Sequence, residues 1–487
     1  MTHADDLLIG WAARDITPDR PVNIFGQFRT RISKGVHDPV TATALSMTSG
    51  GDSVIWVSCD LCLVPMAVLE QCREKLLRRL PHFPAGKLIM SATHTHCAPA
   101  PDDFWYPPVP EGVMTPAEYC AFLSDRIAEA VEESWNARKP GAVGWGHGYA
   151  VVGHNRRAVY FDDLSRRPGH VPLPGVRTEK TARMYGNTND PRFDCIEGYV
   201  DHSVNMLFTF DHDKRLTGAV INLPCPAQET EHMEEISADF WHDARAEIRK
   251  RHGGHVFLLP QCAPSGDLSP HLMYNKKAEQ RMLTLKNRTS RQEIACRIAS
   301  AFDDTLGWAQ KDIRRTAALK HVARTIALDR RLISDDEYRD AQADLAALGK
   351  AGAASAGEAQ PPWGEQESVL FARKSRCTRI IERYEEQKTA RALPVHLHVV
   401  RLGEIVFATS PFELFLDFGL RIVARSPAVQ TFLVQLAADN HFSYLATRKA
   451  EQGESYSACL YSNEIGSAGG QQLVEETVKT IDELWAD

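Results

Sequence analysis

Short apolar runs alternate with stretches of helical periodicity along most of the chain. Runs of about four to eight apolar and often β-branched residues predict buried strands. They occur at residues 53–58, 87–91, 204–210, 218–223, 255–259 and 431–436, and residues 395–407 predict two strands. Apolar positions spaced three and four residues apart predict amphipathic helices at residues 68–80, 116–135, 239–252, 414–425 and 471–485. This alternation predicts an α/β (α+β) fold in which mixed β-sheets are flanked by helices.

The stretch from about residue 310 to 395 has a different pattern. Charged helical patterns at 335–348 and 368–389 are separated by an Ala-, Gly- and Pro-rich stretch at 349–362, which is typical of an exposed loop. No internal repeat and no Pro/Ser-rich linker divides the chain. We therefore expect a single domain over residues 1–487 with a helical excursion at about 310–395.

Composition and charge narrow the possible functions. Hydrophobic residues make up 43% of the chain and charged residues 24%, which is ordinary for a globular protein. Lys and Arg number 56 against 63 Asp and Glu, giving a net charge of -7 without a basic cluster, so we expect no nucleic-acid partner. No apolar run approaches the ~18 residues of a membrane span. The eleven cysteines show no paired CxxC motif and the N-terminus no signal peptide, so we expect reduced thiols and a cytoplasmic protein.

The strongest local signal for chemistry is Ala92-Thr93-His94-Thr95-His96-Cys97, directly after a predicted strand. Side chains two positions apart on an extended segment point to the same side, so both imidazoles can reach one metal ion or one substrate. The alternative is a pair of partly exposed loop histidines. The position after a buried strand favours the functional interpretation.

Further motifs follow one another through the chain. In order, they are Gly10 to Thr17, Ser58-Cys59-Asp60, Ser91 to His96, Asn155-Arg156, Ile236-Ser237-Ala238-Asp239, Gly266-Asp267-Leu268-Ser269-Pro270, Pro411-Phe412-Glu413, Ser443 to Thr447 and Tyr456. Together they resemble the neutral/alkaline ceramidases, zinc amidohydrolases that cleave N-acyl sphingoid bases. The resemblance covers about residues 8 to 486 and is weakest between 280 and 390.

This resemblance implies a site and a mechanism. Zinc (Zn2+) would be held by His94, Glu413 and Tyr444, and the scissile carbonyl would be surrounded by the side chains of His96, Arg156 and Tyr456. Ser269 would hydrogen-bond the substrate, although a turn residue before Pro270 is the competing interpretation. The resemblance also implies the ceramidase catalytic domain alone, without the C-terminal β-sandwich domain of the secreted enzymes.

One ligand position departs from the family. Where ceramidases have a His before a Pro, this chain has Cys225 between Pro224 and Pro226. A thiolate is a good zinc ligand, and the flanking prolines restrict its backbone, so we predict that Cys225 is a substitute ligand. A buried structural Cys is the alternative, and His232 and Glu234 are other candidate ligands. Because a thiolate and a carboxylate neutralise the charge of zinc, we expect activity that rises into the alkaline range.

The predicted function is that of a zinc-dependent hydrolase that cleaves an amide (N-acyl) bond by metal-activated water. The substrate would be a small-molecule or lipid N-acyl amide, with ceramide as one candidate. Two alternatives stay open at this point. One is hydrolysis of an ester or lactam at the same site, and the other is a non-catalytic binding protein with an altered metal site.

Overall fold

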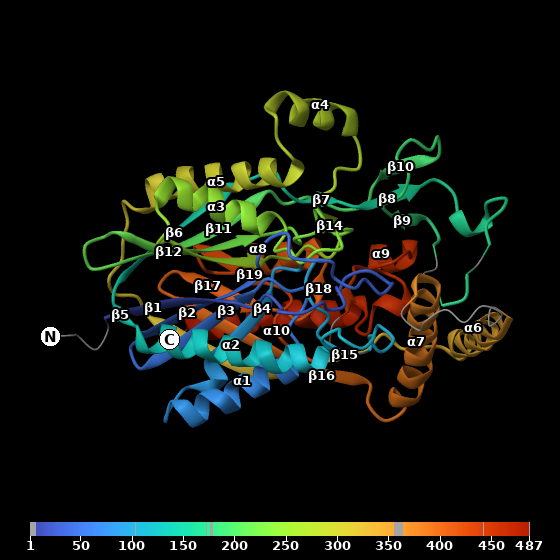
Figure 1. Cartoon of the computed structure of the whole chain (residues 1–487), viewed down its shortest axis with the longest axis horizontal. Coiled ribbons are helices and arrows are strands. Elements are labelled where there is room, and N and C mark those ends of the chain that lie inside the picture. Colours follow the sequence, from blue (N-terminus) through green and yellow to red (C-terminus); the bar gives the residue numbers. More distant parts are fainter. Residues whose placement is uncertain are drawn as a thin grey trace.

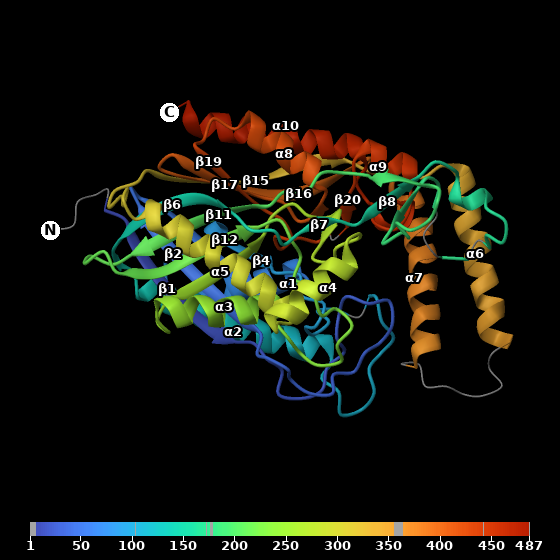
Figure 2. The ribbon, with the colours of Figure 1, turned by 90° about the horizontal axis from the view of Figure 1, so that it is seen from above.

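The computed structural model describes residues 6–102, 104–171, 173–175, 179–354, 364–441 and 443–486. Over these residues the chain is a mixed α/β protein with three larger sheets (Figures 1 and 2). The predicted fold class is therefore confirmed. No helix of the described ranges combines the length and the apolar character needed to cross a membrane.

Each larger sheet carries helices on one face. The first has the order β4-β3-β2-β1-β5 and is covered by α1 and α2: β1 Leu8–Asp15, β2 Thr41–Ser49, β3 Asp52–Cys59, β4 Leu88–Ala92, β5 Lys139–Pro140, α1 Met66–Arg79 and α2 Pro116–Asn136. The second has the order β13-β12-β11-β6 and is covered by α3 and α5: β6 Ala142–Tyr149, β11 Ser203–Phe210, β12 Leu216–Leu223, β13 Phe257–Cys262, α3 Phe240–His252 and α5 Ser290–Ala309. The third has the order β15-β16-β17-β19 and is covered by α8 and α10: β15 Leu319–Asp329, β16 Ala392–Leu402, β17 Ile405–Thr409, β19 Gln430–Val434, α8 Leu416–Arg425 and α10 Ser467–Trp485.

The other faces of the three sheets meet in one central core. This core takes apolar side chains from all three sheets, so the inner strands are buried on both faces, as their apolar runs predict. The ring of Trp56 on β3 lies 4.8 Å from that of Phe407 on β17. Trp11 on β1 stacks on Phe257 of β13 with ring centroids 5.8 Å apart. These aromatic contacts join the first sheet to the third and to the second.

Local sequence explains several of these elements. Thr115 and Glu118 form a reciprocal capping box with Pro116 in the first turn of α2, a combination that starts helices. The glycine-rich stretch within β6 lies at a sheet edge under α5. A Cβ atom on Gly146 would lie 2.5 Å from the side chain of Thr305, so the absence of side chains there allows α5 to pack against the sheet.

Residues 310–395 contain more than helices. β15 is an eleven-residue strand with alternating burial that pairs along its whole length with β16, which the expectation of a helical excursion missed. Between these strands stand α6 (Asp335–Ala354) and α7 (Glu365–Glu386), side by side at one end of the molecule (Figures 1 and 2). The rings of Tyr338 and Tyr384 stack between them at 4.1 Å. The division of the chain into domains stays a prediction.

Each larger sheet contains one parallel pair of strands joined by a helix. The pairs are β3 and β4 through α1, β12 and β13 through α3, and β17 and β19 through α8. The remaining elements complete the surroundings of the strand ends: β7 His154–Asn155, β8 Arg157–Tyr160, β9 Ala182–Met184, β10 Phe193–Ile196, β14 Leu268–Ser269, α4 Lys276–Lys286, β18 Glu413–Leu414, β20 Tyr444–Leu445 and α9 Arg448–Gly453. Ligand sites of α/β proteins lie beyond the carboxyl ends of parallel strands.

Candidate active site

The segments that follow the parallel strands bring the predicted site residues together. His94 and His96 follow β4, Glu413 follows β17, and Tyr444 follows β19. All four line a cavity of about 500 Å³. A second cavity of about 750 Å³ shares His96, Tyr444 and Tyr456 with the first. His94, His96, Arg156, Glu413, Tyr444 and Tyr456 therefore lie around these two adjoining cavities, whereas Cys225 and Ser269 line neither of them.

His94 is held in an unusual backbone conformation. Its φ is 65°, a left-handed value that few residues other than glycine adopt, and its amide donates to the carbonyl of Leu61 over 2.9 Å. The ring is buried, and Nδ1 lies 2.7 Å from the carbonyl oxygen of Cys62. Since a carbonyl only accepts hydrogen bonds, Nδ1 is the donor. Nε2 is therefore the nitrogen of His94 that is available to a cation.

A carboxylate faces this nitrogen. Glu413 Oε2 lies 3.2 Å from Nε2 of His94, and the short parallel bridge between β18 and β20 pairs Glu413 with Tyr444. Burial alone would lower the pKa of His94, but Cys62 and Glu413 beside it raise that pKa well above its usual value. A lone pair and a carboxylate so close together need a positive charge between them, which a proton or a metal ion provides.

The residues at this position fit a zinc ion. Nε2 of His94 is buried and has no hydrogen-bond partner, and imidazole nitrogen and carboxylate oxygen are common zinc ligands. Tyr444 adds a phenol that interacts with Glu413. His94, Glu413 and Tyr444 thus form a coherent set of donors, and their ligation stays a prediction.

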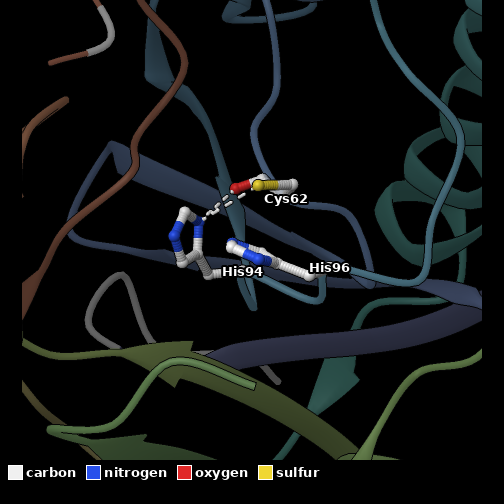
Figure 3. A group of neighbouring side chains, drawn as sticks. All are labelled: Cys62, His94 and His96. Carbon is white, nitrogen blue, oxygen red and sulfur yellow. Dashed lines mark hydrogen bonds between the residues drawn. The ribbon is translucent and has the colours of Figure 1, made fainter. Parts of the chain in front are cut away.

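A second set of candidate ligands lies on the other side of the His94 ring. Ligand atoms of Cys62, His94 and His96 lie within 4.8 Å of one another (Figure 3). Burial raises the pKa of the Cys62 thiol, but the two imidazoles outweigh this effect and lower it to about 7. Cys62 Sγ is 3.5 Å from Nδ1 of His94, the nitrogen that already donates to a carbonyl. This set therefore offers thiolate character, whereas the set with Glu413 offers the free imidazole nitrogen.

Cys225 does not belong to the group formed by Cys62, His94 and His96. It is buried in the core of the second sheet, and its Sγ is 3.4 Å from the carbonyl oxygen of Pro226. Burial raises the pKa of this thiol well above its usual value, which disfavours a thiolate without a metal. Of the other two candidates, Glu234 pairs with Lys34, and the side chain of His232 is 80% exposed at the second cavity. Ligation by Cys225 stays a prediction.

Arg156 lies against the predicted ligands. Its Nη2 is 3.3 Å from the hydroxyl of Tyr444 and 3.9 Å from Glu413 Oε2. Burial would lower the pKa of Arg156, but Tyr185, Tyr444 and Glu413 raise it well above its usual value, so the guanidinium keeps its charge.

Tyr456 completes this side of the first cavity. Its ring meets that of Tyr444 edge to face, with centroids 5.4 Å apart. Burial raises the pKa of its phenol. The hydroxyl is therefore protonated at neutral pH and available as a hydrogen-bond donor.

Ser269 is fully buried at the end of β14, directly before Pro270, and it pairs with His154 of β7. Its Oγ accepts a hydrogen bond from the amide of His271 over 3.2 Å. This contact agrees with the alternative of a turn residue, and a contact with substrate stays a prediction.

The sequence analysis did not place Cys62, Gln228 and Glu231 in the site. In the structure Gln228 and Glu231 contact the ring of His96, and Cys62 lies beside His94. The same argument that singled out His94 would have found Cys62, since it follows the end of β3 closely. Three arginines on one face of α7 also line the first cavity. They are Arg376, Arg379 and Arg383.

Comparison with solved structures shows which known fold this chain resembles. The neutral ceramidase from Pseudomonas aeruginosa matches with a TM-score of 0.66 at 16% sequence identity, over 98% of this chain and 75% of that chain. This chain has a neutral-ceramidase-like fold. A structure described as ceramidase complexed with C2 also matches this chain. Its TM-score is 0.64 at 16% sequence identity, over 98% of this chain and 75% of that chain. No family model and no curated protein matches the sequence.

Proposed function

We propose that this protein is a metal-dependent hydrolase that cleaves the amide bond of an N-acyl substrate. The observation that carries the proposal is the buried Nε2 of His94, which faces the Glu413 carboxylate at 3.2 Å without a hydrogen-bond partner. The ceramidase-like fold supports amide hydrolysis as the reaction.

Zinc is the proposed metal, held by His94, Glu413 and Tyr444. When bound, zinc supplies Lewis-acid chemistry, which polarises a carbonyl and lowers the pKa of water from ~15.7 towards neutrality. The fourth position goes to a thiolate. Cys225 is the candidate from the sequence. Cys62 lies on the Nδ1 side of the His94 ring, and it is the candidate thiolate if the metal binds instead to the set of Cys62, His94 and His96.

The remaining residues of the site act on the substrate. Arg156 and Tyr456 are donors that stabilise the negative charge growing on the carbonyl oxygen, a contribution of about 10²–10³-fold for one such donor. Ser269 is retained as a substrate contact. The proposed substrate is a small-molecule or lipid N-acyl amide, and the eleven free cysteines support a cytoplasmic location.

The decisive experiment measures amine release from a panel of N-acyl compounds that share one acyl chain, short-chain ceramide included, with and without a zinc chelator. We expect turnover that the chelator abolishes and added zinc restores. Ester and lactam analogues in the same panel test the competing bond types. Chelator-resistant turnover would overturn the metal-dependent mechanism, and no turnover at all would favour a binding protein.

The zinc content of cysteine variants identifies the thiol that binds the metal. Zinc bound per chain is measured in Cys62→Ser, Cys225→Ser and the double variant, with Cys72→Ser as a matched control because Cys72 is a buried thiol packed between α1 and α2. Loss of zinc in one single variant assigns the ligand to that residue. Full zinc content in both single variants and the double variant would remove the thiolate from the proposal.

A further inference from the structure

Many of the side chains that line the second cavity are charged. Glu229 and Glu231 come from the segment after β12, Lys276 and Glu279 from α4, and Arg297 from α5. An alkyl chain placed against such groups would take them out of water without supplying hydrogen bonds, which costs free energy. This cavity therefore suits a polar part of a substrate.

The first cavity has an apolar wall that the second cavity lacks. Phe25 and Leu63 line it from a cluster of buried side chains, against which Trp105 packs. Charged groups of the same cavity are paired with one another, as Arg379 is with Glu464 at 2.7 Å. An acyl chain is stabilised by contact with the apolar wall. A chain bound there leaves the amine portion of the substrate for the second cavity.

Tyr185 lies in the wall of the second cavity directly after β9. Its φ is 53°, a left-handed value that residues with large side chains rarely adopt. Its amide donates to the carbonyl oxygen of Arg156 over 2.7 Å, and its ring centroid is 5.9 Å from that of His271. A backbone conformation of this kind persists where the surroundings hold it, and it is common at ligand sites.

The hydroxyl of Tyr185 has a defined direction. Nη1 of Arg156 lies 3.3 Å from the phenol oxygen. A guanidinium can only donate hydrogen bonds, so this oxygen accepts and its own proton points elsewhere. Ser269 interacts with the same phenol but is fully buried, whereas Tyr185 is 36% exposed. Of these two hydroxyls, that of Tyr185 is therefore the one that a molecule in the second cavity meets.

We propose that Tyr185 is a specificity-determining residue that donates a hydrogen bond to the amine portion of the substrate in the second cavity. The substrate class is an N-acyl amine with one apolar acyl chain and a short amine portion, which carries a hydroxyl or another acceptor close to the amide nitrogen. This inference rests on the proposed function, because it places the amide bond at the residues that the two cavities share.

Three amides of one acyl chain test the substrate class. They are the ethanolamide, the propylamide and the ceramide, and the first two differ only by a hydroxyl in place of a methyl group. We expect kcat/KM of the ethanolamide to exceed that of the propylamide by about 3- to 10-fold, the range of one neutral hydrogen bond, and also to exceed that of the ceramide. An equal or higher value for the propylamide or the ceramide would overturn the proposal.

Tyr185→Phe tests the residue. The ratio of kcat/KM between ethanolamide and propylamide should fall to about 1, because the donor is removed. A purely structural role would lower both values together, and an unchanged ratio would overturn the proposal. Tyr160→Phe is the matched control, since Tyr160 is buried, donates its hydroxyl to the carbonyl of Asn187 and lines neither cavity. The control should keep the ratio of the wild type.

Binding separates this inference from the proposed function. The dissociation constants of the ethanolamide and the propylamide are measured by calorimetry with chelator-treated protein. We expect the same 3- to 10-fold preference, and we expect Tyr185→Phe to lose it. A binding preference without turnover by the zinc-loaded protein would overturn amide hydrolysis alone. Equal dissociation constants for the wild type would overturn the role of Tyr185, whether or not the protein hydrolyses an amide.

Discussion

Two pairs of buried histidines show how the same residue type takes on different roles. The rings of His94 and His96 lie 4.9 Å apart, and those of His321 and His398 lie 5.2 Å apart. The first pair lies at the cavity and the second between β15 and β16, where Nε2 of His321 is 2.9 Å from Nδ1 of His398. His94, His321 and His398 are buried, and the side chain of His96 is 12% exposed.

Their charged neighbours differ. Each histidine of the cavity pair faces a carboxylate at 3.2 or 3.3 Å, and its pKa is raised despite burial. Burial lowers the pKa of His321 to about 4 and that of His398 well below its usual value. The comparison teaches that burial alone lowers the pKa of a histidine, whereas the thiol of Cys62 and the facing carboxylates raise the pKa of His94 and His96 despite burial.

Removing the carboxylate from the cavity pair should have the largest effect. In Glu413→Gln, Nε2 of His94 loses its charged neighbour, and zinc affinity should fall by more than about 100-fold, since loss of outer-shell partners alone costs 10- to 100-fold. Zinc titration of the variant checks this, with the exposed Glu404→Gln as control. Wild-type affinity in Glu413→Gln would break the comparison.

The structural pair should make the protein acid-sensitive. Both histidines must take up a proton when the chain unfolds at low pH, because their folded pKa lies below the unfolded value near 6.5. Their contribution is complete above pH 6.5 and is lost as the pH falls towards about 4, on the order of 3 kcal/mol for His321. Urea unfolding at several pH values measures this loss. The double variant His321→Leu/His398→Leu should show a flatter dependence, and an equally steep one would contradict the assignment.

Replacing the thiol of Cys225 by an imidazole should have a moderate effect. If Cys225 ligates zinc, Cys225→His replaces an anionic ligand by a neutral one, and the pH profile of activity should move towards acid by about one pH unit. Cys225→Ser serves as control. A profile that does not move would count against Cys225 as a ligand.

The smallest effect concerns the ion pair beside His321. Asp52 accepts a hydrogen bond from the amide of His321 and pairs with Lys87 at 2.8 Å. The pair is partly exposed, so Asp52→Asn should cost about 1 kcal/mol or less of unfolding free energy. Chemical denaturation at neutral pH measures it. A loss as large as that expected for the acid-exposed histidine pair would show that this ion pair, and not burial, controls the region.

Local patterns predicted the helices α1, α2, α3, α6, α7, α8 and α10 and eight of the longer strands, together with the position of His94 at the end of β4, but they missed the helix α5 and the strand β2. They failed at β15, where eleven residues of alternating burial lie inside a stretch dominated by charged helical patterns. The alternation is visible in the sequence. Which face of β15 is buried, however, depends on its pairing with β16 and on the helices that pack against this sheet. Strand pairing between distant segments therefore decided this element.

The site divides in the same way. The sequence by itself determined the fold class and the residue types at the strand ends, because periodicity and turn chemistry depend on near neighbours along the chain. Only the tertiary structure decided that Nε2 of His94 faces Glu413, that Cys62 lies beside Nδ1, and that Gln228 reaches His96 from 132 residues away. Hydrogen-bond direction and electrostatics act over a few ångströms of space, and spacing along the sequence does not report that distance.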